Sequence, residues 1–165
     1  MSIESHADWE GLRGAAQVAS LTLDTLTKQV RPGVLTGDLD RTAELLFAAH
    51  GARSAPALVY GFPRTVLISV NDEVVHGVPG PRRLRRGDLV KLDVTVEKNG
   101  FIADAARSVI VGPGTTFSSS TSATTPFMTA DTSIRMVTNA AAIRPRTLMT
   151  LRFIPGLTFS WTTGT

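Results

Sequence analysis

Cysteine is missing altogether from this chain of 165 residues. Its absence excludes disulfide bonds and thiolate metal sites, so any bound metal must use oxygen and imidazole ligands. Long apolar runs are also missing, because no stretch approaches the roughly 18 consecutive apolar residues of a membrane span. The first segment, MSIESHADWEGL, contains three acidic residues and no apolar core, so it does not resemble a secretory signal. We therefore expect a cytoplasmic protein with no membrane partner.

Residues 1–112 lack an excess of charge of either sign, since they contain 13 Lys or Arg and 13 Asp or Glu. The net charge of +3 comes from residues 113–165, with four Arg and one Asp. The one dense basic cluster, PRRLRRGD at residues 81–88, precedes a strand-like segment and is typical of a solvated turn. A nucleic-acid-binding surface needs basic residues spread along a face, with aromatic residues among them. We therefore expect no nucleic-acid partner.

Residues 113–165 contain no Glu, no Lys and no His, but 20 Ser or Thr. The run TTFSSSTSATT is of low complexity, and only a short apolar piece at 148–157 is compatible with a strand. We therefore divide the chain into a domain over residues 1–112 and an unassigned tail over residues 113–165. A frameshift after Gly112, a fusion with an unrelated sequence, or a disordered tail would each explain such a change of composition.

Residues 1–112 combine helical and strand-like patterns. Apolar residues recur at helical spacing over 12–30 and again over 36–50. Thr36 is expected to be the N-cap of the second helix, and His50 its last residue. Residues 57–75 have a strand-like pattern. This order predicts an α+β domain with a mostly antiparallel sheet.

A β-hairpin is expected over residues 89–111. Two segments rich in Val, Ile and Leu flank Asn99-Gly100, a dipeptide that forms two-residue hairpin turns because both residues tolerate positive φ. The face expected to lie in the core consists of alternate apolar side chains: Val90, Leu92, Val94, Val96, Phe101, Ala103, Ala105 and Val109.

The other face of this hairpin contains two carboxylates. A two-residue turn places Thr95 opposite Asp104 and Asp93 opposite Ala106, so both aspartates point to the same side. A three-residue turn would place them on opposite sides. Two like charges on one face repel each other, and a divalent cation between them would relieve the repulsion. The alternative is that one aspartate is solvated and the other caps a bend.

Three blocks of this region form a specific pattern. They are SVNDEVVHGVP at 69–79, GDLVKLDVT at 87–95 and GFIAD at 100–104, and VRPGVLTGDLD at 30–40 precedes them. With this pattern, residues 10–112 resemble the N-terminal half of the type I methionine aminopeptidases, members of the pita-bread metallopeptidase family. The resemblance implies half of a pita-bread fold, with two helices packed on a mostly antiparallel sheet and an irregular C-terminal tail.

The resemblance assigns roles to five residues. Asp93 and Asp104 match the first two ligands of a pair of divalent ions (Mn, Fe, Co or Zn), with a water or hydroxide between the ions as the nucleophile. His76 matches a histidine that contacts the scissile peptide and stabilises the tetrahedral intermediate. Phe62 and Leu67 fall on positions that line the methionine pocket, although core packing is the alternative for both.

Thr95 would lie beside the metal ligands as a hydrogen-bond partner. The family completes its site with one histidine and two glutamate ligands, and with another histidine near the substrate, from the second half of the fold. Residues 113–165 contain neither residue type. We therefore expect weak or partial metal binding, no activity of this chain alone, and open apolar surface on the sheet that allows self-association.

The leading functional hypothesis is a methionine aminopeptidase-like protein, truncated and inactive as it stands. Its substrate would be a peptide or nascent chain that begins with methionine. One alternative is a relative of the prolidases and creatinases, which share the fold. Another is a non-catalytic binding module derived from the pita-bread fold.

Overall fold

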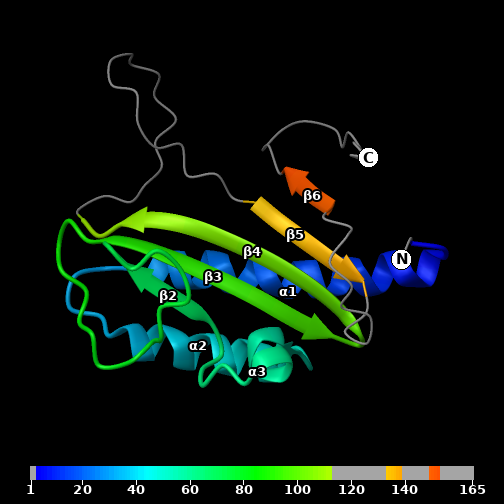
Figure 1. Cartoon of the computed structure of the whole chain (residues 1–165), viewed down its shortest axis with the longest axis horizontal. Coiled ribbons are helices and arrows are strands. Elements are labelled where there is room, and N and C mark those ends of the chain that lie inside the picture. The colour runs from blue at the N-terminus through cyan, green and yellow to red at the C-terminus, as the bar shows by residue number, and fades with distance from the viewer. Residues whose placement is uncertain (1–2, 113–132, 139–148, 153–165) are drawn as a thin grey trace, which may run out of the picture.

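The computed structural model describes residues 3–112, 133–138 and 149–152. A six-stranded antiparallel sheet packs against helices on one face, and α1 passes behind β3 and β4 in Figure 1. The elements are α1 (His6–Gln29), α2 (Thr36–Ala49), β1 (Arg53–Ser54), α3 (Ala55–Tyr60), β2 (Leu67–Val70), β3 (Leu89–Lys98), β4 (Phe101–Ile110), β5 (Ser133–Thr138) and β6 (Met149–Arg152). This arrangement confirms the predicted α+β class.

Helix α1 begins with a reciprocal cap between two side chains. Ser5 Oγ accepts a hydrogen bond from the Asp8 backbone N–H at 3.1 Å, and Asp8 Oδ2 accepts one from the Ser5 N–H at 3.1 Å. The helix ends three residues before Pro32, a residue that cannot continue it. The predicted helix over 12–30 is therefore confirmed, and it begins earlier, at His6.

Helix α2 is confirmed in position, but the prediction that Thr36 is its N-cap is wrong. The N-cap is Leu35, and Thr36 is the first helical residue and buried. The hydroxyl of Thr36 donates to Gly80 O at 3.2 Å and accepts from Gly80 N at 3.0 Å. The Thr36 hydroxyl, which the sequence suggested as a helix cap, therefore bonds to the distant loop at Gly80 instead. His50 lies at the C-terminal end as expected, but as the C-cap directly after the last helical residue, Ala49.

The strand-like pattern over 57–75 is only partly confirmed, because its first part is helix α3. Ser54 Oγ caps this helix by accepting from Ala57 N at 3.4 Å, Pro56 lies in its first turn, and Gly61 ends it in the left-handed conformation with φ 70°. Strand β2 follows at Leu67–Val70. These caps explain why an apolar segment that contains the β-branched Val59 becomes a short helix.

Strand β3 is paired along both of its edges. Strands β1 and β2 pair with one edge of β3, and β4 pairs with the other edge. The β3–β4 turn consists of Asn99 and Gly100, with φ 51° and 85°. Lys98 is paired with Phe101, which is the register that a two-residue turn requires.

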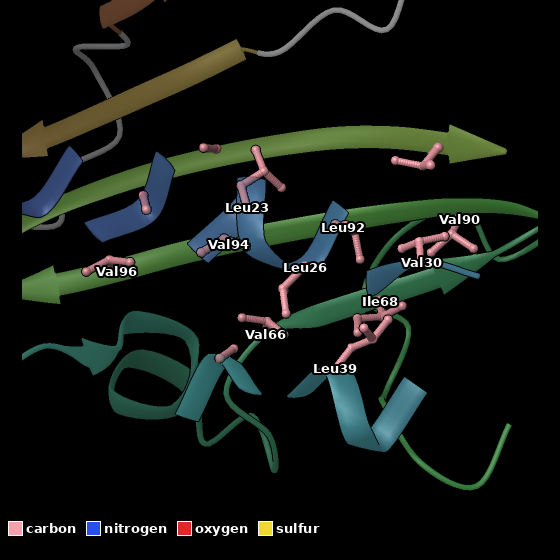
Figure 2. Packing of buried hydrophobic residues seen from close by; sticks show 14 of the residues in the cluster. Leu23, Leu26, Val30, Leu39, Val66, Ile68, Val90, Leu92, Val94 and Val96 are labelled. Carbon is pink, nitrogen blue, oxygen red and sulfur yellow. The ribbon is translucent and has the colours of Figure 1, made fainter. Parts of the chain in front are cut away.

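The hydrophobic core lies between the helices and the predicted inner face of the hairpin. Figure 2 shows Leu23, Leu26 and Val30 of the α1 segment beside alternate valine and leucine side chains of β3. The predicted core residues are buried, with Phe101 partly buried. Helices α1 and α2 therefore cover the face of the hairpin that does not carry the two aspartates. The part of the chain that the structure describes contains no helix that could cross a membrane.

Candidate functional site

The two aspartates lie on the sheet face that points away from α1 and α2. Thr95 pairs with Asp104, and Asp93 pairs with Ala106, so the predicted register is confirmed. Both aspartates are half-buried. Thr95 Oγ1 donates to Asp104 Oδ1 at 3.0 Å, which fixes one carboxylate oxygen.

Strand β2 adds side chains to the same face. Leu67 is paired with Asp93, and Ser69 is paired with Lys91, so their side chains lie on the carboxylate side of the sheet. Leu67 and Ser69 are each only 3% exposed. The buried position of Leu67 next to Asp93 is compatible with a pocket wall and with simple core packing.

Three aromatic rings meet where α3 ends and the loop after β2 returns. The ring of Tyr60 stacks on that of His76, with centroids 6.1 Å apart and an interplanar angle of 25°. Phe62 meets the edge of Tyr60 at a centroid distance of 6.3 Å. The structure therefore brings His76 and Phe62, which lie on different loops, into contact with the same ring.

Tyr60 connects this aromatic group to the two aspartates. Its pKa is raised above the usual value, first by burial and then by the negative charges of Asp93 and Asp104. The raised pKa extends upward the pH range over which the phenol stays protonated. Sequence reasoning missed Tyr60, although it is the single tyrosine of the chain and directly precedes Gly61, a helix-ending signal.

The rim of this site is apolar and open. Residues of α3 and of the loop that carries His76 expose large hydrophobic side chains: Leu58, Val59, Val74, Val75 and Val78. On the sheet, Ile110 at the end of β4 is 58% exposed. The exposed apolar side chains thus gather on α3 and on the histidine loop, and Ile110 is the one such residue among the described residues of the strands.

The donor set fits a hard divalent cation, because carboxylate oxygens are the ligands that such ions prefer. Among residues 3–112 no group of three or more His, Asp or Glu side chains could hold a metal ion. Two carboxylates on one face can therefore supply part of a coordination sphere. A strongly retained ion would need further ligands.

Comparison with known proteins identifies relatives of this region. Residues 10–140 match the model of metallopeptidase family M24. A methionine aminopeptidase of Staphylococcus epidermidis is 42% identical over 112 residues, which are 68% of this chain and 45% of the relative. One of Clostridium perfringens is 46% identical over 101 residues, which are 61% of this chain and 41% of the relative. The chain thus spans less than half the length of these relatives.

Solved structures give the same result. A methionine aminopeptidase from Rickettsia prowazekii superposes with a TM-score of 0.64 at 36% identity, covering 68% of this chain and 45% of the other. A prolidase from Pyrococcus furiosus is 22% identical with a TM-score of 0.56, covering 67% and 31%, and this likeness shows the fold alone. The family match extends over most of the chain and includes the hairpin with both aspartates, and the chain belongs to metallopeptidase family M24.

Proposed function

We propose that residues 3–112 supply the first part of the metal and substrate site of a methionine aminopeptidase. The observation that carries this proposal is the register of the β3–β4 hairpin, which puts Asp93 and Asp104 on one face, away from the helices. The position of Tyr60 and His76 beside that face supports it. The proposed setting is the cytoplasm, and the proposed substrate is a peptide or nascent chain with methionine first.

Sequence identity favours methionine removal over cleavage before proline. The methionine aminopeptidases cited above are 36–46% identical to this chain, whereas the prolidase is 22% identical. Cleavage of Met-Ala-Ser compared with an Xaa-Pro dipeptide separates the two activities directly.

Asp93 and Asp104 would hold the metal in this proposal, and Mn, Fe, Co or Zn each suits oxygen and imidazole ligands. A pair of divalent ions, when bound, would polarise the peptide carbonyl and supply a hydroxide nucleophile. Thr95 would orient the Asp104 carboxylate through its 3.0 Å hydrogen bond. The ligands that complete such a site must come from outside residues 3–112.

The remaining residues would act on the peptide. His76 is exposed at the apolar rim, where its imidazole can donate a hydrogen bond to the oxygen of the reacting carbonyl. Phe62 and Leu67 would contact the methionine side chain. Phe62 is half-buried beside Tyr60, whereas Leu67 is almost fully buried, so Phe62 is the more accessible of the two.

A chimera tests this proposal. Residues 1–112 are joined to the second half of the Staphylococcus epidermidis relative, and methionine release from Met-Ala-Ser is measured with Mn(II) or Co(II). We expect activity, a loss of bound metal in Asp93→Asn, and in His76→Ala a loss of turnover of about 100-fold or more with unchanged metal content. Full turnover of His76→Ala in an active chimera would refute its role.

A non-catalytic binding module is the second candidate. It is favoured by the absence of a third metal ligand among the described residues up to Gly112. A chimera that folds and binds metal but releases no methionine would support this candidate over the first. The domain boundary at Gly112 and the frameshift hypothesis also remain proposals, and the family match beyond this residue, to 140, argues for examining the coding frame further downstream.

A further inference from the structure

His76 has a backbone conformation that a residue with a side chain rarely adopts, with φ 59°. Left-handed conformations of this kind persist only where the surrounding structure enforces them. His76 is exposed, so burial of its own side chain does not provide the constraint. The chain on either side of it therefore supplies the constraint, together with the stacking of its ring on Tyr60.

The next residue, Gly77, lies directly against strand β2. Gly77 O accepts a hydrogen bond from the Ile68 N–H at 2.9 Å. A Cβ atom at Gly77 would lie 2.2 Å from Ile68 O, so no side chain fits here. This close approach orients the Gly77 N–H toward the carboxylate side of β2.

Ser69 accepts a hydrogen bond from the Gly77 N–H. Its Oγ accepts from Gly77 N at 3.1 Å, and the side chain is 3% exposed. A buried hydroxyl gives a hydrogen bond with little competition from water. Ser69 also lies on the face of the sheet that carries Asp93 and Leu67, so it connects this face to the histidine loop.

Other contacts anchor the loop at positions further along the chain on both sides of His76. The Glu73 carboxylate accepts from Val70 N at 2.8 Å and from Arg82 Nη1 at 2.8 Å. The side chains of Glu73 and Arg82 are both partly exposed. On the far side, Thr36 binds Gly80 through its hydroxyl. The hydrogen bond that Ser69 Oγ accepts from the Gly77 N–H lies between these anchors, one residue after His76.

We propose that Ser69 is a positioning residue that holds His76 in its left-handed conformation, through Gly77, with the imidazole against Tyr60. This inference rests on the proposed function for its consequence, namely that His76 reaches the substrate carbonyl from a fixed position. A preorganised donor stabilises developing charge without the cost of reorganisation. Ser69 contributes by fixing geometry and does not touch the substrate.

Nuclear magnetic resonance of the full chain tests the proposal without metal or substrate. In Ser69→Ala we expect amide exchange at Gly77 to become roughly tenfold faster, because one net hydrogen bond is lost. We also expect the contact signal between the Tyr60 and His76 rings to disappear, and the His76 backbone coupling to move toward that of extended chain. Gly77→Ala should produce the same three changes by pushing the loop off β2.

Two control variants separate this effect from general loosening. Gly80→Ala adds a methyl group in the same loop, where a Cβ meets nothing within 4 Å. Thr22→Val removes a buried hydroxyl that has no partner among the described residues. Both controls should keep the His76 signals of the wild type.

Unchanged His76 signals in Ser69→Ala or, should that variant not fold, in Gly77→Ala would overturn the proposal. So would equal changes in the Gly80→Ala control. Failure of the proposed function is a separate result, because it would appear as an inactive chimera while the His76 signals still depend on Ser69. In an active chimera, Ser69→Ala should lower kcat by about tenfold with bound metal unchanged.

Discussion

Asp93 and Asp104 repel each other across the hairpin unless a cation lies between them. Replacing either by asparagine keeps the size of the side chain and removes one charge, and the amide oxygen in Asp104→Asn can still accept the hydrogen bond of Thr95. We therefore expect Asp93→Asn and Asp104→Asn to unfold in chelator at the wild-type temperature or slightly above it. A clear loss of stability in both variants would show that the carboxylates are structural.

Glu97 has a different role, at the end of β3. Its side chain accepts from Arg53 Nε at 2.8 Å and from the Gly100 N–H at 2.8 Å, although it is almost fully buried. Burial alone would raise its pKa, but the bond from Arg53, the bond from Gly100 and the charge of Arg53 bring the pKa below the usual value. The carboxylate is therefore the form that the fold stabilises.

Because the folded pKa of Glu97 is depressed, its contribution is present above the unfolded pKa of about 4.5 and is lost as the pH falls through the lower folded value. Glu97→Gln should cost about 1 kcal/mol of unfolding free energy at pH 7. The difference between the two proteins should shrink progressively below pH 4.5. Denaturant unfolding at several pH values measures it, and a difference that does not depend on pH would contradict this role.

At the scale of elements, α1 packs closely on the hairpin at Gly11. A Cβ atom at this position would lie 2.2–2.7 Å from ring atoms of Phe101, the first residue of β4. Gly14, one turn later, has no neighbour within 4 Å of such an atom. The same substitution at two positions of one helix therefore has opposite expected results.

Gly11→Ala should lower the unfolding free energy by about 1–3 kcal/mol, because the helix or the ring must move. Gly14→Ala should raise it by up to about 1 kcal/mol, because alanine favours the helix. Thermal or urea unfolding of both variants checks the pair. Equal stabilisation by both would mean that α1 does not pack on Phe101 as the structure shows.

The elements also show what could be predicted from the sequence. The β3–β4 hairpin and its register follow from Asn99-Gly100, because the loop length sets the side of every residue after it. The helix α3 had local signals in Ser54, Pro56 and Gly61, but its Leu-Val-Tyr segment favoured a strand. The contacts of Ser69 with Gly77, and of Tyr60 with His76, depend on how a loop folds back onto β2. Such contacts between residues of different segments could not be predicted from any local sequence pattern.

At the scale of the whole molecule, α1 and α2 cover one face of the hairpin and the two aspartates lie on the other. Membership of metallopeptidase family M24 agrees with this division, since the matched region contains the carboxylate pair. The register of the two aspartates could be predicted from the hairpin turn. Their roles as metal ligands came from the resemblance in sequence, because spacing alone was also compatible with a solvated aspartate. The central claim is that the two aspartates form part of a metal site.

Titration calorimetry of the full chain with Mn(II) tests this claim most directly. The matched control is Asp38→Asn with Glu44→Gln, which removes the same charge from exposed positions of α2. We expect weak binding by the wild type and by the control, and no binding by Asp93→Asn with Asp104→Asn. Equal binding by all three proteins would contradict the assignment of Asp93 and Asp104 as metal ligands.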